Sequence, residues 1–526
     1  MSTMSATRSI RELPGPRGLP LIGSLHQTWR LGRSHIVIED WADRYGPLYK
    51  FRAARRLMIV VSDPEEINRV LRERPEGFRR WREIEAGFQE IGFPGVFSVE
   101  GETWRRQRQL VVRALNTNHL HRHFHAIRVA TERLHRRLTD AARGGDPINL
   151  TAILTAYTVD VTSTLAFGHD LNTLEHGDGE LQQHIQRTFK MLSFRVFFPV
   201  PYWRWIKLRA DRELAVSVKH LHSAVLGFIV QARERMSARP ELFEEPENFL
   251  EAMLAAQRED GTFTDEEIIG NVFALLLAGE DTTAHTMAWT SWFLAQHPDA
   301  QARWAQEASD VLGEAPYPSD PGIVANLPYG EAVLRESMRL KAVANGTTVE
   351  ALTDTTIRDT RIPAGTRLIL ELRQVSRRAG GPEYRPERWL NENEDGNHRD
   401  GNGAQGADRQ PSQKEFLAFG AGPRFCPGRN LAFLESKTAM AMIARNFQIE
   451  LDESAAPVTE HFAFTMIPRG LRVRLRERTG NKPTESATAR AGVSANADGS
   501  EGIGESGCPA ATNGQRQPAP SPHGAG

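Results

Sequence analysis

The chain has 526 residues, of which 40% are hydrophobic and 25% charged, and this composition indicates a globular protein with a large buried core. Its formal net charge is −1, so no overall basic field indicates binding to nucleic acid or to an acidic membrane surface. Two cysteines exclude a disulfide framework and are typical of a reducing compartment, so we expect a cytoplasmic protein. The first twenty residues are polar and contain proline, so we expect neither a signal peptide nor a transmembrane anchor.

The elements that we expect follow from local patterns along the chain. In order, they are a flexible N-terminal arm (1–12), two short strands (48–51 and 57–61), a helix opened by Asp63-Pro64, a mainly helical region (103–257), a turn followed by a strand (362–372) and a closing strand (471–475). Two further segments are polar and poor in large apolar residues. We interpret 391–413 as a surface loop and 479–526 as a disordered C-terminal tail.

The longest predicted helix carries polar residues in its middle. The run Thr264–Glu267 has the pattern of a capping box and Pro298 marks the end, which gives about 33 residues and about 50 Å. The segment 273–278 is apolar on every side, so we expect this helix to be buried. Gly279-Glu280-Asp281-Thr282 follows directly, although glycine and carboxylates are unfavourable inside a buried helix. Taken alone, this polar segment is either a functional site or a stripe that faces a neighbouring helix.

A second unusual segment is the run from Phe419 to Gly428, which contains Cys426. An isolated cysteine is most often a small buried hydrophobic residue. Here glycines free the backbone, prolines stand on both sides, and Arg424 lies two residues before the cysteine. Such a loop can direct backbone N–H groups and a cation at the sulfur, and these conditions favour the thiolate, which is the form that binds metals.

This run resembles the haem-ligand loop of the cytochrome P450 family. Five of its positions stand where that pattern has them: Phe419, Gly422, Arg424, Cys426 and Gly428. The resemblance covers 13–478, which we interpret as one catalytic domain. It implies a mainly α-helical fold with small β-sheets, a long central helix over haem b, and Cys426 as the iron ligand, with Phe419 and Gly428 in the haem-binding loop. Since no anchor is expected, the chain looks like the soluble, bacterial-type members of the family.

The polar segment of the long helix resembles the oxygen-activating segment of the same family. By this resemblance Glu280, Asp281 and Thr282 form the catalytic segment. Asp281 and Thr282 are expected to deliver protons during the activation of O2, because a hydroxyl beside a carboxylate can support a hydrogen-bonded chain. The helix is expected to widen at Gly279 and to leave room for dioxygen and water.

Residues for the haem carboxylates are also indicated. Trp104 and Arg108 are four residues apart on a predicted helix, so both side chains can reach one ligand. By resemblance they bind a haem propionate together with Arg424, whose fork of donors matches a carboxylate; otherwise Trp104 is an interior aromatic residue. The strand region 347–352 lacks the arginine that often reaches the second propionate in the family. The partner of that propionate is therefore undefined by the sequence.

Glu336 and Arg339 stand three residues apart on a predicted helix, a spacing that is common for surface ion pairs. The pair also resembles the Glu-x-x-Arg element of the family, which closes a buried network with an arginine from a later loop. Arg388 stands where that third partner is expected. The role implied is structural, since the network positions the core around the cysteine loop.

The resemblance implies a monooxygenase, which inserts one oxygen atom from O2 into an organic substrate. We expect an apolar small molecule, because apolar residues fill the segments that line the pocket in this family: Phe88, Phe93, Phe97, Phe194, Phe197, Phe198, Val343, Ala344 and 462–466. No Gly-x-Gly-x-x-Gly motif for a nicotinamide or flavin is found, so we expect a separate electron donor such as a ferredoxin. The basic residues Arg105, Arg106 and Arg113 are either its docking face or an ordinary solvated surface.

Two other functions are compatible with the sequence. A haem-thiolate enzyme that uses peroxide, or that isomerises hydroperoxides, needs neither O2 nor a reductase. Such relatives typically lack an acid–alcohol pair like Asp281-Thr282, which is intact here. A non-catalytic haem-binding sensor, the second alternative, would not need a proton relay either.

Overall fold

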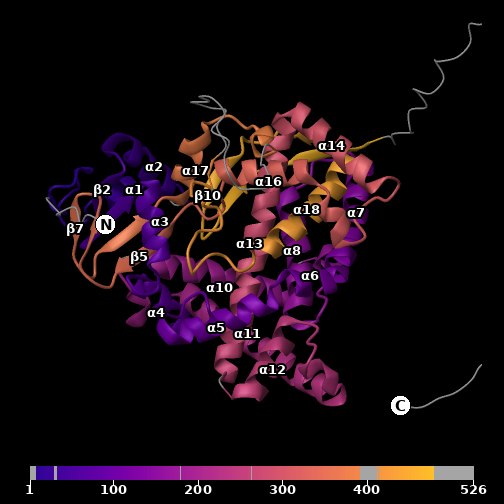
Figure 1. Ribbon diagram of the computed structural model, residues 1–526, viewed down its shortest axis with the longest axis horizontal. Helices are drawn as coiled ribbons and strands as arrows, with labels where there is room; N and C mark the ends of the chain where they lie inside the picture. The colour runs from indigo at the N-terminus through magenta and orange to yellow at the C-terminus, as the bar shows by residue number, and fades with distance from the viewer. Residues whose placement is uncertain are drawn as a thin grey trace, which may run out of the picture. The chain divides into compact units, whose positions relative to one another are not determined.

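Figure 1 shows the computed structural model, which describes residues 8–28, 32–177, 179–198, 200–261, 263–390, 411–412 and 414–478. The expected C-terminal tail and most of the expected surface loop lie outside these residues, as do the first seven residues of the expected arm. Residues 8 and 9 of that arm form a two-residue strand, which pairs in parallel with 360–361.

Helices make up most of the described chain, as the family resemblance predicted. They are α1 (Leu25–Thr28), α2 (Ser34–Tyr45), α3 (Pro64–Arg72), α4 (Arg82–Glu90), α5 (Gly101–Ala114), α6 (Thr117–Arg122), α7 (Phe124–Gly144), α8 (Leu150–Phe167), α9 (Thr173–His176), α10 (Glu180–Phe197), α11 (Arg209–Ala238), α12 (Phe249–Asp260), α13 (Asp265–Gln296), α14 (Pro298–Leu312), α15 (Pro321–Ala325), α16 (Pro328–Leu340), α17 (Leu372–Gly380) and α18 (Arg429–Asn446), with the 3-10 helices η1 (Tyr202–Arg204), η2 (Pro240–Phe243) and η3 (Pro386–Trp389).

The strands form small sheets. They are β1 (Arg8–Ser9), β2 (Leu48–Ala53), β3 (Arg56–Val61), β4 (Phe78–Arg80), β5 (Thr347–Ala351), β6 (Thr355–Ile357), β7 (Thr360–Ile362), β8 (Arg367–Leu370), β9 (Phe447–Leu451), β10 (Thr459–Phe462), β11 (Met466–Arg469) and β12 (Val473–Glu477). The largest sheet has the order β2-β3-β8-β5-β4, and the others have the orders β1-β7-β6, β10-β11 and β12-β9. In the largest sheet, β4 is antiparallel to β5, and this pairing matters for the site described below.

Several local predictions are confirmed. Strands β2 and β3 cover the expected pair, and Asp63 caps α3 by accepting hydrogen bonds from two backbone N–H groups of its first turn. The closing strand is β12. The strand expected over 366–372 is shorter, because β8 ends at Leu370 and α17 begins at Leu372. Between them the Glu371 N–H still donates to the Val61 carbonyl, so the chain leaves the sheet only after that bond.

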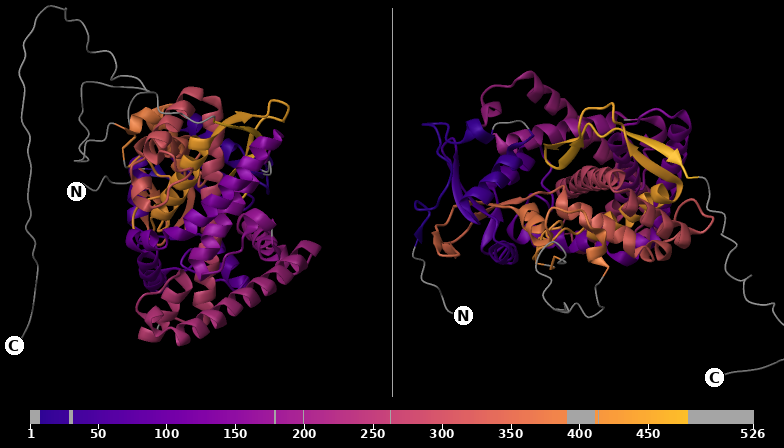
Figure 2. Two further views of the ribbon diagram at one scale, coloured as in Figure 1. Left: turned by 90° about the vertical axis from the view of Figure 1, so that its right-hand side faces the viewer. Right: turned by 90° about the horizontal axis from the view of Figure 1, so that it is seen from above.

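The long helix α13 runs through the core. Thr264 and Glu267 form the expected capping box, and the helix continues for 32 residues. It contacts α8, α16 and α18, and in the right-hand view of Figure 2 it is seen nearly end-on among the surrounding helices. Because helices cover it on several sides, apolar residues occur all around it rather than on one stripe.

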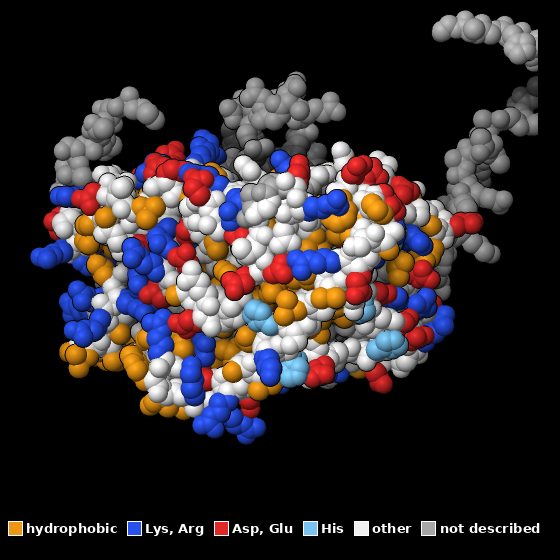
Figure 3. All heavy atoms as spheres, turned by 90° about the horizontal axis from the view of Figure 1, so that it is seen from below, with side chains coloured by type: hydrophobic (Ala, Val, Ile, Leu, Met, Phe, Trp, Pro, Cys, Tyr) orange, Lys and Arg blue, Asp and Glu red, His pale blue; other side chains and the backbone are white. Residues whose placement is uncertain are grey.

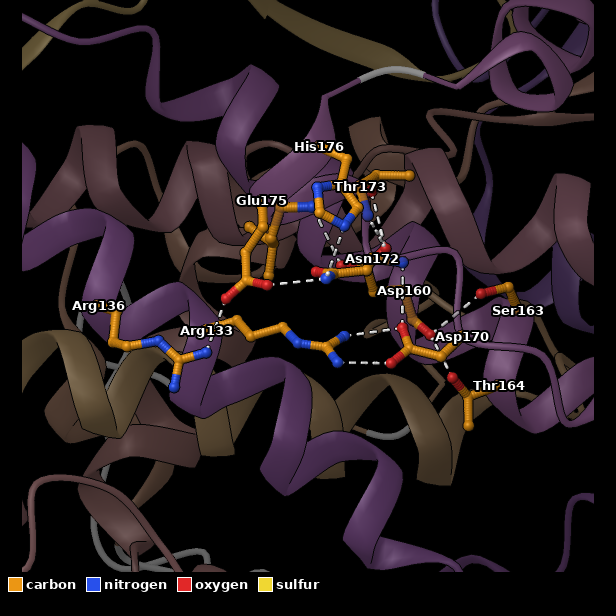
Figure 4. A network of polar contacts seen from close by, with 11 residues as sticks. Arg133, Arg136, Asp160, Ser163, Thr164, Asp170, Asn172, Thr173, Glu175 and His176 are labelled. Carbon is orange, nitrogen blue, oxygen red and sulfur yellow. Dashed lines mark hydrogen bonds and ion pairs between the residues drawn. The ribbon is translucent and has the colours of Figure 1, made fainter.

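Helix α8 approaches α13 closely where the polar segment begins. A Cβ on Gly279 would lie 2.5 Å from the Thr162 hydroxyl, so only glycine allows this approach. Helix α8 is also tied to α9 through Asp160, whose oxygens accept hydrogen bonds from the N–H groups of Thr173 and Leu174 and from the Thr173 hydroxyl at 2.6–3.1 Å (Figure 4). This network fixes α8 and thereby supports the middle of α13.

Two described helices, α8 and α11, are long and apolar enough to cross a membrane by length and composition. The most apolar 18 residues of α8 are 72% buried inside the protein, as is usual for a core helix, whereas those of α11 are 28% buried.

Charge is distributed unevenly over the surface. Figure 3 shows Lys and Arg side chains concentrated toward the left of the face seen from below, with hydrophobic side chains between them.

Candidate active site

The loop that contains Cys426 lies directly before α18. Gly422 adopts a positive φ of 69°, and a Cβ there would lie 2.2 Å from the Leu71 carbonyl oxygen, so this position requires glycine. The Cys426 N–H donates to the Phe419 carbonyl at 3.0 Å and closes the loop. Gly428 is the N-cap of α18, which places the sulfur near the positive end of a helix.

The charge environment of the sulfur differs from the expectation. Burial raises the pKa of the Cys426 thiol, while the Gly428 N–H, the Arg108 guanidinium and the Arg429 N–H oppose this shift. The predicted backbone donors are therefore present, but the protein surroundings alone do not favour the thiolate. The cation that acts on the sulfur is Arg108 rather than Arg424. A bound metal ion is what would deprotonate such a thiol.

Arg424 instead faces Trp104 on α5. Its guanidinium carbon lies 4.4 Å from the centre of the Trp104 ring. Arg424 Nη2 donates to the Val99 carbonyl at 2.9 Å and to Glu100 at 2.5 Å. Arg108 donates to the Phe425 carbonyl, next to the cysteine. The structure thus brings Trp104, Arg108 and Arg424 to the cysteine loop.

Arg424 belongs to an arginine cluster that we define as Arg74, Arg80 and Arg424. Among the residues that the structure describes, five buried nitrogens of this cluster have no hydrogen-bond partner: Arg74 Nε and Nη2, Arg80 Nε, and Arg424 Nε and Nη1. Burial and the neighbouring Arg80 lower the pKa of Arg424 to about 9, and only Glu100 and a bond to it oppose the shift. Burial, Arg80 and Arg424 lower the pKa of Arg74 well below its usual range. Unpaired buried donors of like charge are costly, so the cluster is suited to an anionic ligand.

The polar segment of α13 contains a second set of titratable groups. Burial raises the pKa of Asp281, and His285, one turn further along, opposes the shift. Burial also lowers the pKa of His285, whose Nδ1 lies 3.0 Å from the Thr465 hydroxyl. The Thr282 hydroxyl donates to the Ala278 carbonyl at 2.6 Å. A carboxyl, a hydroxyl and an imidazole therefore occupy neighbouring turns of one buried helix, and His285 was not foreseen from the sequence.

The expected widening of α13 at Gly279 is wrong for this structure, since the segment is α-helical throughout. The glycine instead allows the close approach of Thr162. Glu280 is buried, and its carboxylate accepts a hydrogen bond from Gln182 of α10 at 3.3 Å. Its backbone carbonyl accepts a bond from the Thr158 hydroxyl of α8 at 2.9 Å. These contacts tie the polar segment to α8 and α10.

The predicted Glu-x-x-Arg network is confirmed. Glu336 and Arg339 are fully buried and joined at 2.8 Å, and Arg388 donates to the same carboxylate at 3.0 Å. Trp389 Nε1 and the Arg385 N–H also donate to it, each at 2.9 Å. Both oxygens of Glu336 are therefore used by partners within the protein.

Aromatic residues from three separate segments meet beside the arginine cluster. The Phe464 ring lies 5.7 Å from Phe97 and 4.9 Å from Phe189. The Arg80 guanidinium carbon stands 4.2 Å from the centre of the Phe97 ring. The three aromatic rings thus join two segments that were predicted to line the pocket, at Phe97 and at 462–466, to α10. Phe189 of α10 was not predicted. Phe197, also predicted to line the pocket, is 45% exposed.

Comparison with known proteins decides the family. The family model described as "Cytochrome P450" matches residues 13–475. The chain belongs to the cytochrome P450 family. It is accordingly a haem-binding oxidoreductase of the monooxygenase type, with the mainly α-helical fold that the sequence predicted.

Similar proteins include several from animals. A "Putative cytochrome P450 CYP13A3" from Caenorhabditis elegans is 25% identical, with 89% of this chain and 94% of the relative covered. A "Thromboxane-A synthase" from Rattus norvegicus is 26% identical over 85% and 87% of the two chains. A "Putative cytochrome P450 cyp-13B1" from C. elegans is 28% identical over 84% and 89%. The expectation of a bacterial-type protein gains no support from these animal relatives.

The residues present fit the haem of a cytochrome P450. Haem carries two carboxylates, and the arginine cluster offers buried guanidinium nitrogens near the cysteine loop that have no partner among the described residues. In the β4–β5 pairing Arg80 stands opposite Val349, in the strand that lacks the family arginine. Arg80 was missed because the pairing of β4 with β5 is visible only in the fold, and Arg74 because its closeness to Arg80 and Arg424 also arises from folding.

Proposed function

We propose that this cytochrome P450 is an O2-dependent monooxygenase in which Cys426 binds the haem iron, and in which Trp104, Arg108 and the arginine cluster bind the propionates. The observation that carries the haem assignment is the set of unpaired arginine nitrogens beside the cysteine loop. When bound, haem supplies the activation of O2 for insertion of one oxygen atom into the substrate. The protein itself binds the haem, orients the substrate and supplies protons.

Proton delivery is assigned to Asp281 and Thr282. The raised pKa of Asp281 keeps a proton available nearer to neutral pH than an exposed aspartate would. The Thr282 hydroxyl, which donates to the Ala278 carbonyl, can rotate to donate its proton to another acceptor and accept a hydrogen bond in return. His285 is a positioning residue for Asp281, and Glu280 holds the segment through Gln182 and Thr158.

The substrate is proposed to be an apolar small molecule. The convergence of Phe97, Phe189 and Phe464 supports this, because aromatic walls bind apolar surface and offer few hydrogen bonds. The electron donor is proposed to be a separate protein, a ferredoxin. Two arginines of the expected docking face are already ion-paired, Arg105 with Glu76 and Arg106 with Glu267. The exposed Arg113 is therefore proposed as the main positive charge that this face offers to the electron donor.

The coupling of electrons to product tests this function. Substrates are first found by screening apolar compounds for a shift in the haem spin state. Thr282→Ala, supplied with reduced ferredoxin, is then expected to retain haem but to form less product per electron consumed. Thr286→Ala is the matched control, since its hydroxyl bonds to the Thr282 carbonyl one turn further along the same helix. Equal coupling in Thr282→Ala and the parent enzyme would remove Thr282 from the mechanism.

The alternative enzymes differ in what they consume. A peroxide-dependent enzyme or an isomerase would turn over without O2 or a reductase, and a sensor would bind without product. The intact Asp281-Thr282 pair favours the monooxygenase over all three. Omitting the electron donor from the assay separates these cases, because product formation should then stop.

We also propose that the enzyme works in the cytoplasm. Cysteine usage supports this, since the cysteine that the structure describes, Cys426, is free. Attachment to a membrane would instead use exposed apolar side chains such as Trp205 and Ile206, which are 73% and 63% exposed. Fractionation of cells decides the matter, and recovery of the enzyme in membranes would contradict the proposal.

A further inference from the structure

We propose a second metal site, separate from the haem, for a divalent transition-metal ion such as Zn²⁺. Its ligands are Glu180 and His184 of α10 and His220 of α11, and its role is to join these two helices. Nitrogen and carboxylate ligands in the combination of two histidines and one glutamate are a known set for Zn²⁺. The inference does not depend on the proposed substrate or electron donor.

The three ligand atoms converge on one point between the helices. Glu180 and His184 are four residues apart, so both side chains leave the same face of α10. A Glu180 carboxylate oxygen lies 3.6 Å from His184 Nε2 and 3.8 Å from His220 Nε2. All three candidate ligand atoms lie within 4.8 Å of one another. Tetrahedral zinc bonds of about 2.0–2.2 Å place ligand atoms about 3.3–3.6 Å apart. The three atoms are already near this spacing, and binding requires at least one of the two nearly parallel rings to turn so that both lone pairs face the ion.

His184 supplies an independent indication of a ligand. Its side chain is only 9% exposed, and Nε2 is buried without a hydrogen-bond partner among the residues that the structure describes. That nitrogen points toward the glutamate and the second histidine. Buried polar atoms are almost always satisfied, so an imidazole nitrogen without a partner in the described chain, at a convergent set of ligands, is suited to binding a metal ion.

The other nitrogen of each ring is already held. His220 Nδ1 lies 2.9 Å from the Val216 carbonyl oxygen, which can only accept, so Nδ1 carries the proton and Nε2 keeps its lone pair. His184 Nδ1 lies 3.0 Å from the Ser217 hydroxyl, which can accept in the same way. Metal-binding histidines are typically oriented by such a bond from the second ring nitrogen.

The surroundings also allow a bound ion. Glu180 has a side chain that is 79% exposed, so one side of the site is open to a water ligand. The His184 and His220 rings lie 4.4 Å apart and nearly parallel. A simple stack of two neutral imidazoles beside a glutamate is the competing explanation, and it predicts no metal binding.

The position suggests what the metal would do. Helix α10 carries Gln182, which bonds to Glu280 of the oxygen-activating segment, and Phe189, which joins the aromatic wall. A metal that fixes the start of α10 to α11 would stabilise the helix that bears both residues. In this proposal the metal joins the two helices and does not touch the reacting atoms.

Binding of Zn²⁺ to the full-length, haem-loaded protein tests the proposal. The protein carries no polyhistidine tag and is freed of metal with a chelator before titration by calorimetry. We expect one Zn²⁺ per chain and a rise in the thermal midpoint, because an ion that binds only the folded state stabilises it. His184→Ala, His220→Ala and Glu180→Gln should each weaken binding by about tenfold or more. His176→Ala, an exposed histidine in the nearby α9, should leave it unchanged.

Two results would overturn the site. One is parent protein that takes up no stoichiometric Zn²⁺, as the stacked pair predicts. The other is uptake that persists in Glu180→Gln and His220→Ala, which would assign the metal to other residues such as Cys508. Glu180→Gln keeps the proposal testable if the buried His184→Ala fails to fold, since Glu180 lies at the surface. The reduced-CO spectrum of each variant verifies that the haem domain is intact.

Discussion

The Glu336 network and the arginine cluster are both buried, yet they differ in how their charges are paired. In the network, one carboxylate accepts bonds from Arg339 and Arg388, and further donors complete it. In the arginine cluster, Glu100 is the carboxylate that opposes several guanidinium groups, and five buried nitrogens have no partner within the described residues. The Glu336 carboxylate has both oxygens bonded within the protein and removing it would strand buried charges, whereas the arginine cluster has more buried donors than acceptors and is suited to an anionic ligand.

The largest expected effect comes from breaking the Glu336 network. Glu336→Ala leaves Arg339 and Arg388 buried without their carboxylate, which should reduce the free energy of unfolding by about 3–5 kcal/mol. Denaturation by urea measures this loss. Glu213→Ala is the control, because its bond to Arg209 is on the surface and should be worth about 0–1 kcal/mol. Similar small losses in both variants would show that the network is not what holds this region.

The arginine cluster should respond in the opposite way. Arg80→Leu removes one of several like charges, so the haem-free protein should lose little stability. Haem affinity should fall by about tenfold or more, since a charge-assisted hydrogen bond contributes about 1.5–3 kcal/mol. The rate of haem transfer to a competing apoprotein measures the affinity.

Arg79→Leu is the matched control on the same strand, because Arg79 is bonded to Glu85. It should leave haem transfer unchanged. The distinction between the two clusters would fail if Arg80→Leu unfolded the haem-free protein but released haem no faster.

A third test concerns the contact between α8 and α13. Gly279→Ala places a Cβ 2.5 Å from the Thr162 hydroxyl, and this overpacking should cost about 1–3 kcal/mol despite the better helix propensity of alanine. Adding Thr162→Ala should restore most of the loss in a double-mutant cycle of unfolding free energies. If the second change restores nothing, the glycine has a role other than close packing.

A fourth test depends on pH and on a buried carboxyl group near the large sheet. Burial, and then the carboxylate of Glu39, raise the pKa of Glu371 from 4.5 to about 8. The folded state therefore holds this proton more tightly than the unfolded chain. The resulting stability is fully present below pH 4.5 and is lost as the pH rises to about 8.

Glu371→Gln cannot ionise and serves as the reference. Between these limits the stability of the parent protein should fall relative to this variant, by at most about 1.4 kcal/mol per pH unit. Parallel pH profiles for the two proteins would contradict the assigned shift.

Local patterns in the sequence predicted the elements well. Asp63 before Pro64 and the capping box at Thr264 define helix starts through bonds within one turn, so they can be recognised without the fold. The end of β8 could not be predicted, because it depends on pairing with β3, a strand some three hundred residues earlier. The widening at Gly279 was wrong for a similar reason, since the closeness of Thr162 is a contact between helices.

The candidate site was predictable where a motif carries it. Cys426, Trp104 and Arg424 stand in short patterns, and the structure brings them together. Arg74 and Arg80 belong to no such pattern, and their proximity to Glu100 and Arg424 arises from folding. The net effect on the Cys426 thiol also needed the structure, because burial outweighs the nearby donors.

The most direct test of the central claim, that Cys426 is the thiolate ligand of the haem, is the spectrum of the reduced enzyme with carbon monoxide. The parent protein and Cys508→Ala, which changes the other cysteine, should both give the red-shifted band of a haem thiolate. Cys426→His should retain haem through the arginine cluster but lose that band. A Cys426→His protein that still shows the red-shifted band would contradict the assignment.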